Sequence, residues 1–288
     1  MRLLTYRYGT MSAVGRLVNN EVVPLPVGDM LELIDHWEQL EEICACGSDQ
    51  SIPLQSVTLL APIPTPRRNV FCLGWNYVEH TRESAQATGR ELKLPERPVF
   101  FTKLTTAVIG PEAPIPYDPR ISEQWDWEVE LAVIIGRRGK NIPAARAGEY
   151  VFGYTVVNDV SVRDVQRAHG GQFFKGKSLD GSCPMGPGIV TADEVPDPHH
   201  LALRSWVNGA LKQDASTAQM FFKIPEIIAW LSLGMTLLPG DIIATGTPAG
   251  VGFARTPPEF LRPGDVVECE VESIGRLCNP VVTEVNIS

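Results

Sequence analysis

Acidic and apolar residues alternate in the segment from Asp126 to Gly136, which reads DWEVELAVIIG. Successive side chains of a β-strand point to opposite faces, so Asp126, Glu128 and Glu130 are predicted to share one face. The other face is wholly apolar. Carboxylates two residues apart on a strand lie only about 6–7 Å apart at the backbone, and they repel one another when buried together. Solvent, basic partners or a divalent cation can relieve this repulsion.

Exposure to water is the simplest interpretation of this alternation, because half-exposed strands usually carry polar residues on their solvent face. A second acid favours a metal site instead. The apolar segment GYTVVNDVS ends in Asp159, just before a helix expected to begin at Ser161. Oxygen ligands held on strand ends suit Mg²⁺, Mn²⁺ or Ca²⁺ better than zinc. Asp159 as the cap of its helix is the alternative.

A histidine and a glutamate are spaced for a catalytic pair in GWNYVEHTRES. Asn76 and Glu79 match a capping box and Gly89 is a helix terminator, so a helix is expected between them. His80 and Glu83 would share one face of it. A carboxylate on one imidazole nitrogen orients the ring and raises its basicity, so that the other nitrogen can take a proton from water. An ordinary surface ion pair explains the same spacing.

Two lysines and a glycine-rich turn are further candidates. The segment GGQFFKGKSLDGSCPMGP predicts a mobile loop that carries Lys175 and Lys177, and a lysine there can neutralise a substrate carboxylate or an enolate. A plain connecting loop is the alternative. ATGTPAGVG allows close approach of backbone to a ligand but lacks the phosphate-binding GxxxxGK[ST] pattern. A tight turn explains it equally well.

Composition excludes several partners. The 288-residue chain is 44% hydrophobic and 20% charged, as expected for a globular protein with a sizeable core, and its formal net charge is −9. Such a charge disfavours nucleic acid and anionic membranes as partners. The six cysteines show no CxxC pair, and the N-terminus lacks a signal-peptide core. A reduced, cytoplasmic protein is therefore predicted.

The order of the predicted elements indicates an α+β fold with an appended N-terminal part. Short strands and one amphipathic helix over residues 30–44 are expected before the proline-rich connector APIPTPRR, and we place a domain boundary between residues 66 and 67. After it the chain reads as short strands with few helices. Asn208-Gly209 predicts a hairpin turn, and Pro225 predicts the first turn of a helix that ends near Gly234.

The order of the motifs resembles the fumarylacetoacetate hydrolase family. The run GWNYVEH, FTKLTTAVIG, DWEVELAVIIG, GYTVVNDVSVRDVQ, KGKSLDGSCPMGP, TGTPAGVG and PGDVVECEVESIG carries the resemblance from Asn69 to the C-terminus. Residues 1–66 resemble the small N-terminal α/β domain of many members. The resemblance implies a mixed β-sandwich roll with peripheral helices for residues 67–288, and a homodimer.

The resemblance also implies roles for individual residues. It makes Glu128, Glu130 and Asp159 ligands of Mg²⁺ or Mn²⁺, and His80 with Glu83 the water-activating pair. Lys177 becomes catalytic. The implied substrate-binding residues are Lys103, Arg163, Gln166 and Thr247. Some acylpyruvate-cleaving relatives have a basic residue where this chain has Trp75.

The implied function is metal-dependent hydrolysis of a carbon–carbon bond in a 2,4-dioxo acid, a small anionic substrate. Water activated by His80 and Glu83 would attack the distal carbonyl and expel a pyruvate enolate, which the cation and Lys177 would stabilise. The alternatives are decarboxylation of an oxaloacetate-like 2-oxo acid, or hydration or isomerisation of 2-oxo-alkenoates from aromatic catabolism. A non-catalytic binding protein on the same fold is a further hypothesis.

Overall fold

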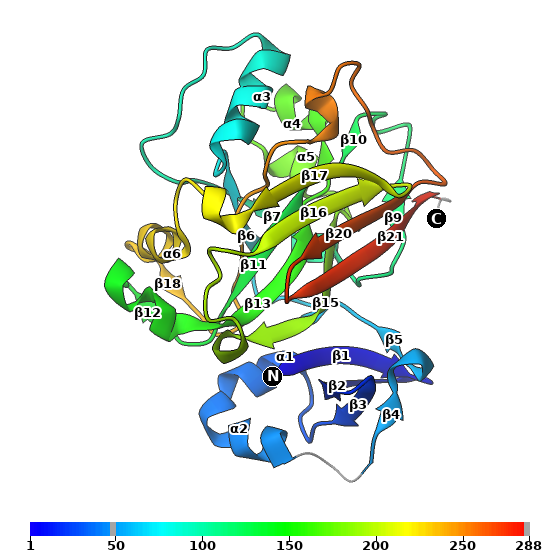
Figure 1. Cartoon of the computed structure of the whole chain (residues 1–288), viewed down its shortest axis with the longest axis vertical. Coiled ribbons are helices and arrows are strands. Elements are labelled where there is room, and N and C mark those ends of the chain that lie inside the picture. The colour runs from blue at the N-terminus through cyan, green and yellow to red at the C-terminus, as the bar shows by residue number, and fades with distance from the viewer. Residues whose placement is uncertain (47–49, 285–288) are drawn as a thin grey trace.

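A long mixed sheet runs through the computed structural model of the protein, which describes residues 1–46 and 50–284 (Figure 1). In spatial order its main path contains β4 (Ile52–Pro53), β3 (Glu21–Pro24), β2 (Met11–Val18), β1 (Arg2–Tyr8), β15 (Cys183–Thr191), β13 (Val151–Asn158), β11 (Val129–Ile135), β19 (Ile242–Ala244), β6 (Val70–Gly74) and β7 (Val99–Lys103). Off this path, β5 (Thr58–Leu59) pairs with β1 and β8 (Val108–Ile109) pairs with β15.

A five-stranded sheet packs against one face of the long sheet. Its strands are, in spatial order, β17 (Ala210–Ser216), β16 (Ala202–Val207), β20 (Val266–Val271), β21 (Gly275–Thr283) and β9 (Ile115–Tyr117). Leu131 and Val133 of β11 belong to the same buried cluster as Leu203, Val267 and Leu277 of the smaller sheet. This apolar layer is the main core, and it makes β11 a central strand that is covered on both faces.

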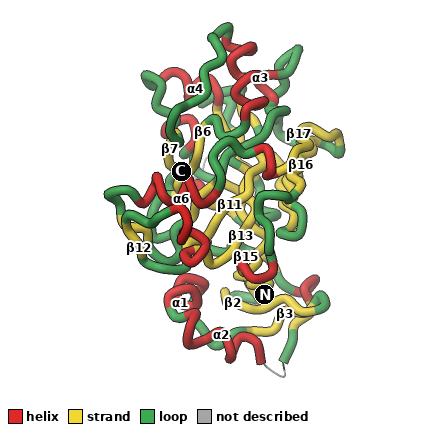
Figure 2. Tube along the Cα trace, turned by 60° about the vertical axis from the view of Figure 1, so that its left-hand side comes forward, coloured by secondary structure: helices red, strands yellow, loops and turns green. Residues whose placement is uncertain are grey.

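The helices lie around the sheets (Figure 2). They are α1 (Met30–Asp35), α2 (Trp37–Cys46), α3 (Val78–Thr88), α4 (Arg163–Ala168), α5 (Phe174–Lys177) and α6 (Ile224–Ser232). The 3₁₀ turns are η1 (Leu54–Ser56), η2 (Thr105–Ala107), η3 (Ala144–Tyr150), η4 (Ala192–Glu194), η5 (Thr217–Gln219) and η6 (Gly252–Ala254). Two small ribbons pair β10 (Trp125–Asp126) with β14 (Ser161–Val162) and β12 (Gly139–Lys140) with β18 (Thr236–Leu237).

The predicted fold class, mixed sheets in a sandwich with peripheral helices, is confirmed. The N-terminal strands and α1 and α2 gather at one end of the molecule, while α3, α4 and α5 gather at the other end (Figure 1). Strand β1 nevertheless pairs with β15, so the N-terminal strands continue the long sheet. The boundary between residues 66 and 67 stays a prediction. Within the described ranges, no helix combines the length and the apolar character that a membrane crossing needs.

Several local predictions are confirmed. Asn208 and Gly209 join β16 to β17, both with positive φ, as a tight hairpin turn requires. Gly89 ends α3 in the left-handed conformation with φ 65°. Pro225 lies in the first turn of α6, which ends at Ser232.

The single helix expected over residues 30–44 is wrong, because the chain forms two helices that are separated at His36. Asp29 caps the first helix by accepting from the backbone N–H of Glu32 at 2.8 Å. The second helix begins at Trp37, whose ring packs edge-on against Phe152 at 5.0 Å. The interruption at His36 therefore divides this segment into two short helices.

Two predicted helix caps are also wrong. The Asn76 side chain binds the backbone of Phe222 and the carbonyl of Thr245, so α3 begins only at Val78. Ser161 lies in β14, and its hydroxyl donates to the carbonyl oxygen of Asp159. Both side chains serve tertiary contacts, which outweigh the local capping preference.

Candidate functional site

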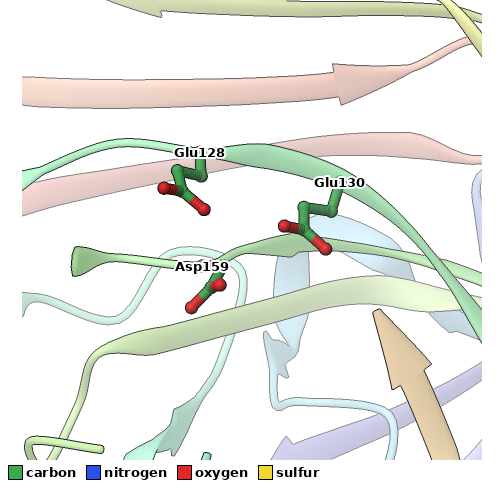
Figure 3. Close-up of side chains that lie close together, drawn as sticks. All are labelled: Glu128, Glu130 and Asp159. Atoms are coloured by element: carbon green, nitrogen blue, oxygen red, sulfur yellow. The ribbon is translucent and has the colours of Figure 1, made fainter. Parts of the chain in front are cut away.

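The register of two antiparallel strands places the three acids together. In the β11–β13 pair Val129 lies opposite Asn158 and Glu130 lies opposite Val157. The next pair outward is Glu128 with Asp159, whose backbone N–H donates to the Glu128 carbonyl at 2.9 Å. Side chains opposite each other on one face of a sheet are close neighbours, and Glu130 is one step along the same face. Figure 3 shows the three side chains lying close together.

These carboxylates are buried, so the interpretation of a strand with acids facing water is wrong. Glu128, Glu130 and Asp159 are 4%, 1% and 0% exposed, and each offers an oxygen within 4.8 Å of the others. The face of β11 that carries Glu130 continues into Ala132 and Ile134, which are packed in a second buried cluster. Alternation of polar and apolar residues therefore marks a polar site inside the protein here.

Three basic side chains neutralise most of this charge. Lys177 Nζ lies 2.7 Å from Glu128 Oε2 and 2.7 Å from Asp159 Oδ2. Lys103 Nζ lies 2.7 Å from Asp159 Oδ1, and Arg163 Nη1 lies 2.7 Å from Glu128 Oε1. Burial opposes ionisation of Glu128, but Lys177 and Arg163 outweigh it and lower its pKa.

Glu130 has no basic partner within salt-bridge distance in the described part of the chain. Its Oε2 accepts from the backbone N–H of Gly246 at 2.7 Å, while its buried Oε1 has no hydrogen-bond partner. Burial, together with the charges of Asp159 and Glu128, raises the pKa of Glu130 well above its ordinary value. An unpaired buried carboxylate is unfavourable unless a cation or a proton compensates it.

A divalent cation fits this donor set. All three side chains offer oxygen, the donor atom that magnesium, manganese and calcium prefer. The unpartnered Oε1 of Glu130 is a free ligand atom inside the triad. Glu128, Glu130 and Asp159 are thus the residues that would hold the ion, and Lys177 already contacts two of them.

Asp126 does not belong to the triad, although the strand pattern placed it on the same face. The strand is interrupted between β10 and β11, so Asp126 lies in the ribbon of β10 and β14. Its Oδ1 accepts from the backbone of Trp127 and Gly252, and its Oδ2 accepts from Phe253 N and Arg163 Nε. Asp126 therefore positions Arg163 and the turn at Gly252.

Replacing Asp126 by Asn is expected to destabilise the protein by about 3 kcal/mol in urea unfolding. Either orientation of the new amide puts an NH₂ group against donors that now reach Oδ1 or Oδ2. Asp214→Asn is the matched control, because Asp214 forms an exposed ion pair with Arg204 at 2.9 Å. The control should change the free energy of unfolding by less than about 0.5 kcal/mol. Equal effects of the two variants would contradict the positioning role.

A cavity of about 660 Å³ opens next to the triad and is lined by Glu128. It is a typical size for a small-molecule site. Most of the predicted site residues line it, namely His80, Glu128, Arg163, Gln166, Lys177 and Thr247. The lining does not include Glu83, Glu130, Asp159 or Lys103. Lys103 is wholly buried behind Asp159 and also donates to the carbonyl of Val160 at 3.0 Å.

His80 and Glu83 form the predicted pair at the cavity wall. His80 Nδ1 lies 2.9 Å from Glu83 Oε1, and the second oxygen of Glu83 accepts from the backbone N–H of Gly250 at 2.8 Å. With Nδ1 engaged by the carboxylate, the other ring nitrogen of His80 is left for proton transfer. The interpretation as an ordinary surface ion pair is wrong, because His80 is only 7% exposed.

Lys177 and Arg163 supply positive charge at the same wall. The segment predicted to be a mobile loop instead folds into α5, and Lys177 is 2% exposed. Burial opposes the charge of Lys177, but Asp159 and Glu128 outweigh it and raise its pKa. Arg163 is held by Asp126 and Glu128, yet its buried Nη2 has no partner and can donate to a ligand. Gln166 accepts from Arg163 Nη1 at 3.3 Å.

Thr247 depends on a residue that the sequence analysis did not identify. The Thr247 hydroxyl donates to the carbonyl of Val129 at 3.0 Å and accepts from Gln213 Nε2 at 2.8 Å. Gln213 also accepts from the backbone N–H of Val129, between the two glutamates. Thr247 therefore lines the cavity with its proton already engaged, as an acceptor. No local motif marks Gln213, because β17 brings it here through sheet packing.

Aromatic side chains complete the cavity. Trp75, which the sequence analysis singled out, lines it together with Phe101, Phe173 and Phe253, which the sequence analysis did not identify. Trp75 has a positive φ of 56° and packs edge-on against Phe173 at 5.3 Å. A bulky residue in this conformation is rare and is usually kept at functional sites.

The fold and site together define a class: a mixed β-sandwich protein with a buried acidic triad, able to hold a divalent cation, next to a ligand-sized cavity that Glu128 lines. Residues 69–282 match the family described as fumarylacetoacetate (FAA) hydrolase C-terminal. The chain belongs to the fumarylacetoacetate hydrolase family.

Relatives and solved structures carry several activities in their names. The mitochondrial oxaloacetate tautomerase fahd2 of Xenopus laevis is 42% identical over 261 residues, which cover 90% of this chain and 79% of that protein. A fumarylacetoacetate hydrolase from psychrophilic Exiguobacterium antarcticum superposes with a TM-score of 0.87 at 38% identity, over 99% of this chain and all of that one. Maleylpyruvate hydrolase from Sphingobium sp. SYK-6, in complex with manganese(II) and pyruvate, has a TM-score of 0.81 at 31% identity, covering 99% of this chain and 100% of that chain.

Proposed function

We propose that this protein is a divalent-cation-dependent enzyme that interconverts the keto and enol forms of an oxaloacetate-like 2-oxo acid. One observation carries the proposal: His80, paired with Glu83, and Glu128 of the cation-ready triad line the same cavity. Keto–enol conversion needs one group that moves a proton and positive charge that stabilises an enolate. The name of the Xenopus laevis relative, an oxaloacetate tautomerase, supports the same reaction.

The contacts of each side chain indicate its role in the reaction. A cation held by Glu128, Glu130 and Asp159 would polarise the 2-oxo group and stabilise negative charge on its oxygen. Arg163 Nη2, which has no hydrogen-bond partner among the described residues, would bind the adjacent carboxylate.

His80 would break the C3–H bond by taking the proton, and the bonding pair would form the C2=C3 double bond. Electrons of the C2=O bond then move onto oxygen, and the histidine returns its proton there to give the enol. Glu83 stabilises the transient imidazolium, because its Oε1 already contacts Nδ1. Lys177, at the same wall, adds positive charge close to the enolate.

Hydrolysis of a carbon–carbon bond in an acylpyruvate is the second candidate. A histidine that removes a proton from carbon can equally remove one from water, and the fold matches maleylpyruvate hydrolase. Decarboxylation of oxaloacetate and isomerisation of 2-oxo-alkenoates pass through the same type of enolate. All four reactions share the enolate-stabilising site and differ in what happens at the carbon chain.

Product analysis separates these reactions. We expect the purified protein with Mg²⁺ or Mn²⁺ to accelerate the decay of the enol absorbance of oxaloacetate, and EDTA to abolish the acceleration. Pyruvate with carbon dioxide would indicate decarboxylation. Acetate with pyruvate, formed from acetylpyruvate, would indicate hydrolysis. Absence of any metal-dependent acceleration of the keto–enol conversion would refute the tautomerase proposal.

Two expectations about the protein in its cell stay predictions. The five cysteines whose side chains are described carry free thiols, which agrees with a reduced compartment such as the cytoplasm. The homodimer can be checked by light scattering after size-exclusion chromatography.

A further inference from the structure

Two arginines at the outer part of the cavity have no ion-pair partner. Arg167 lies at the end of α4, and Arg90 follows the terminator of α3. Both line the cavity that leads to the triad. Within residues 1–46 and 50–284, no carboxylate lies within 4.0 Å of either guanidinium group, although Glu91 and Glu96 also line the cavity.

Arg167 lies beside Arg163, an arginine that already pairs with two carboxylates. The guanidinium carbons of Arg163 and Arg167 lie 4.5 Å and 4.8 Å from the centre of the same Phe253 ring. Arg163 binds Asp126 and Glu128, whereas no acid in the described part of the chain forms an ion pair with Arg167. Partial burial and then the charges of Arg163 and Arg90 lower the pKa of Arg167. An anion at this position would relieve the repulsion among these positive charges.

Helix geometry orders the two arginines of α4 along the cavity. Residues four apart lie on the same helix face, about one turn from each other. The inner one, Arg163, is buried and contacts Glu128 of the triad, and the outer one, Arg167, is exposed. A substrate bound at the triad would thus extend past Arg163 toward Arg167.

We propose that Arg167, together with Arg90, binds a second carboxylate of the substrate, so that the cavity selects dicarboxylic 2-oxo acids. The inference rests on the proposed function and assigns the residues that recognise the second carboxylate of its substrate. A guanidinium group recognises a carboxylate through two parallel hydrogen bonds, and the ring of Phe253 holds the guanidinium of Arg167 in place.

Pyruvate and oxaloacetate form a matched pair of probes, because they differ only in the second carboxylate. Deuterium exchange at C3 of pyruvate is followed by NMR in D₂O, with Mn²⁺ removed before measurement. It reports proton transfer at the triad and His80 without a second carboxylate. The decay of the enol absorbance reports tautomerisation of oxaloacetate. Exchange or tautomerisation by the wild-type protein tests the proposed function itself, and failure there leaves both probes unaccelerated.

Arg167→Gln is expected to raise KM for oxaloacetate about tenfold with a smaller change in kcat, the effect of losing a hydrogen bond to a charged group. The ratio of oxaloacetate kcat/KM to the pyruvate exchange rate should fall by the same factor, and further in Arg90→Gln/Arg167→Gln. Arg146→Gln, which removes an exposed arginine paired with Glu149, is the control.

An unchanged ratio in the single and the double variant overturns the inference, even if the wild-type enzyme is fully active. An equal loss with both probes also overturns it, since it would show general damage to the site. Arg167→Lys should recover part of the loss, because it keeps the charge but not the two-pronged geometry.

Discussion

Glu130→Gln is expected to abolish tight binding of the divalent cation, and with it turnover, without destabilising the metal-free protein. Glu130 offers the triad its unpartnered oxygen and forms no ion pair in the described chain. Amide for carboxylate therefore replaces an anionic metal ligand by a weaker, neutral one and also removes a buried carboxylate that has no basic partner. In the wild-type protein, Mn²⁺ at 100 times its dissociation constant adds about 2.7 kcal/mol of stability. The variant should lose this gain in a thermal-unfolding titration.

The neighbouring glutamate provides the sharpest comparison. Glu128→Gln should lower metal affinity and activity together in the same way, yet it should also destabilise the metal-free protein by about 3 kcal/mol. The difference arises because Glu128 neutralises both Lys177 and Arg163, whereas Glu130 neutralises neither. Glu270→Gln on β20 is the surface control. Normal Mn²⁺ stabilisation of Glu130→Gln would contradict the assignment of the metal site.

His80→Ala is expected to keep the cation and lose the reaction. His80 lies on α3 and contacts Glu83, and neither residue is among the three predicted ligands. A positioned general acid or base contributes about 10²–10⁴ in rate, so kcat should fall by that factor. The Mn²⁺ dissociation constant obtained from thermal stabilisation should stay within about twofold of the wild-type value.

His36→Ala is the matched control for this experiment, because His36 lies far along the chain at the C-terminal cap of α1 and is exposed. Glu83→Gln should give an intermediate loss of rate, since its remaining carbonyl oxygen can still accept from Gly250 or His80 but carries no charge. If His80→Ala turned over oxaloacetate at the wild-type rate, proton transfer would have to be assigned to another residue.

Local patterns predicted the elements that carry the site. The alternation over Val129–Ile135 correctly identified the apolar face of β11, which packs on the smaller sheet. Gly89, Pro225 and Asn208-Gly209 acted as expected, because backbone conformation at these residues is restricted locally. Burial of the opposite face could not be predicted from the pattern. The same alternation of residue types arises whether water or lysine side chains neutralise the acids.

Long-range contacts decided the residues that were misassigned. Asn76, Ser161 and Asp126 each have side chains suited to a local role, but tertiary partners occupy them instead. Lys177 was expected on a mobile loop because glycines surround it. Two buried carboxylates order it, and the gain from pairing these charges outweighs the flexibility of the glycines.

The amino-acid sequence alone was enough to predict the family, the strand that carries two of the acids, and the types of group that the chemistry needs. The folded structure was needed to show that Asp159 lies opposite Glu128, that Lys103 lies behind the triad, and that Gln213 holds Thr247. The physical reason is that side-chain direction follows from local backbone geometry, whereas charge compensation depends on which distant strands pair and in what register.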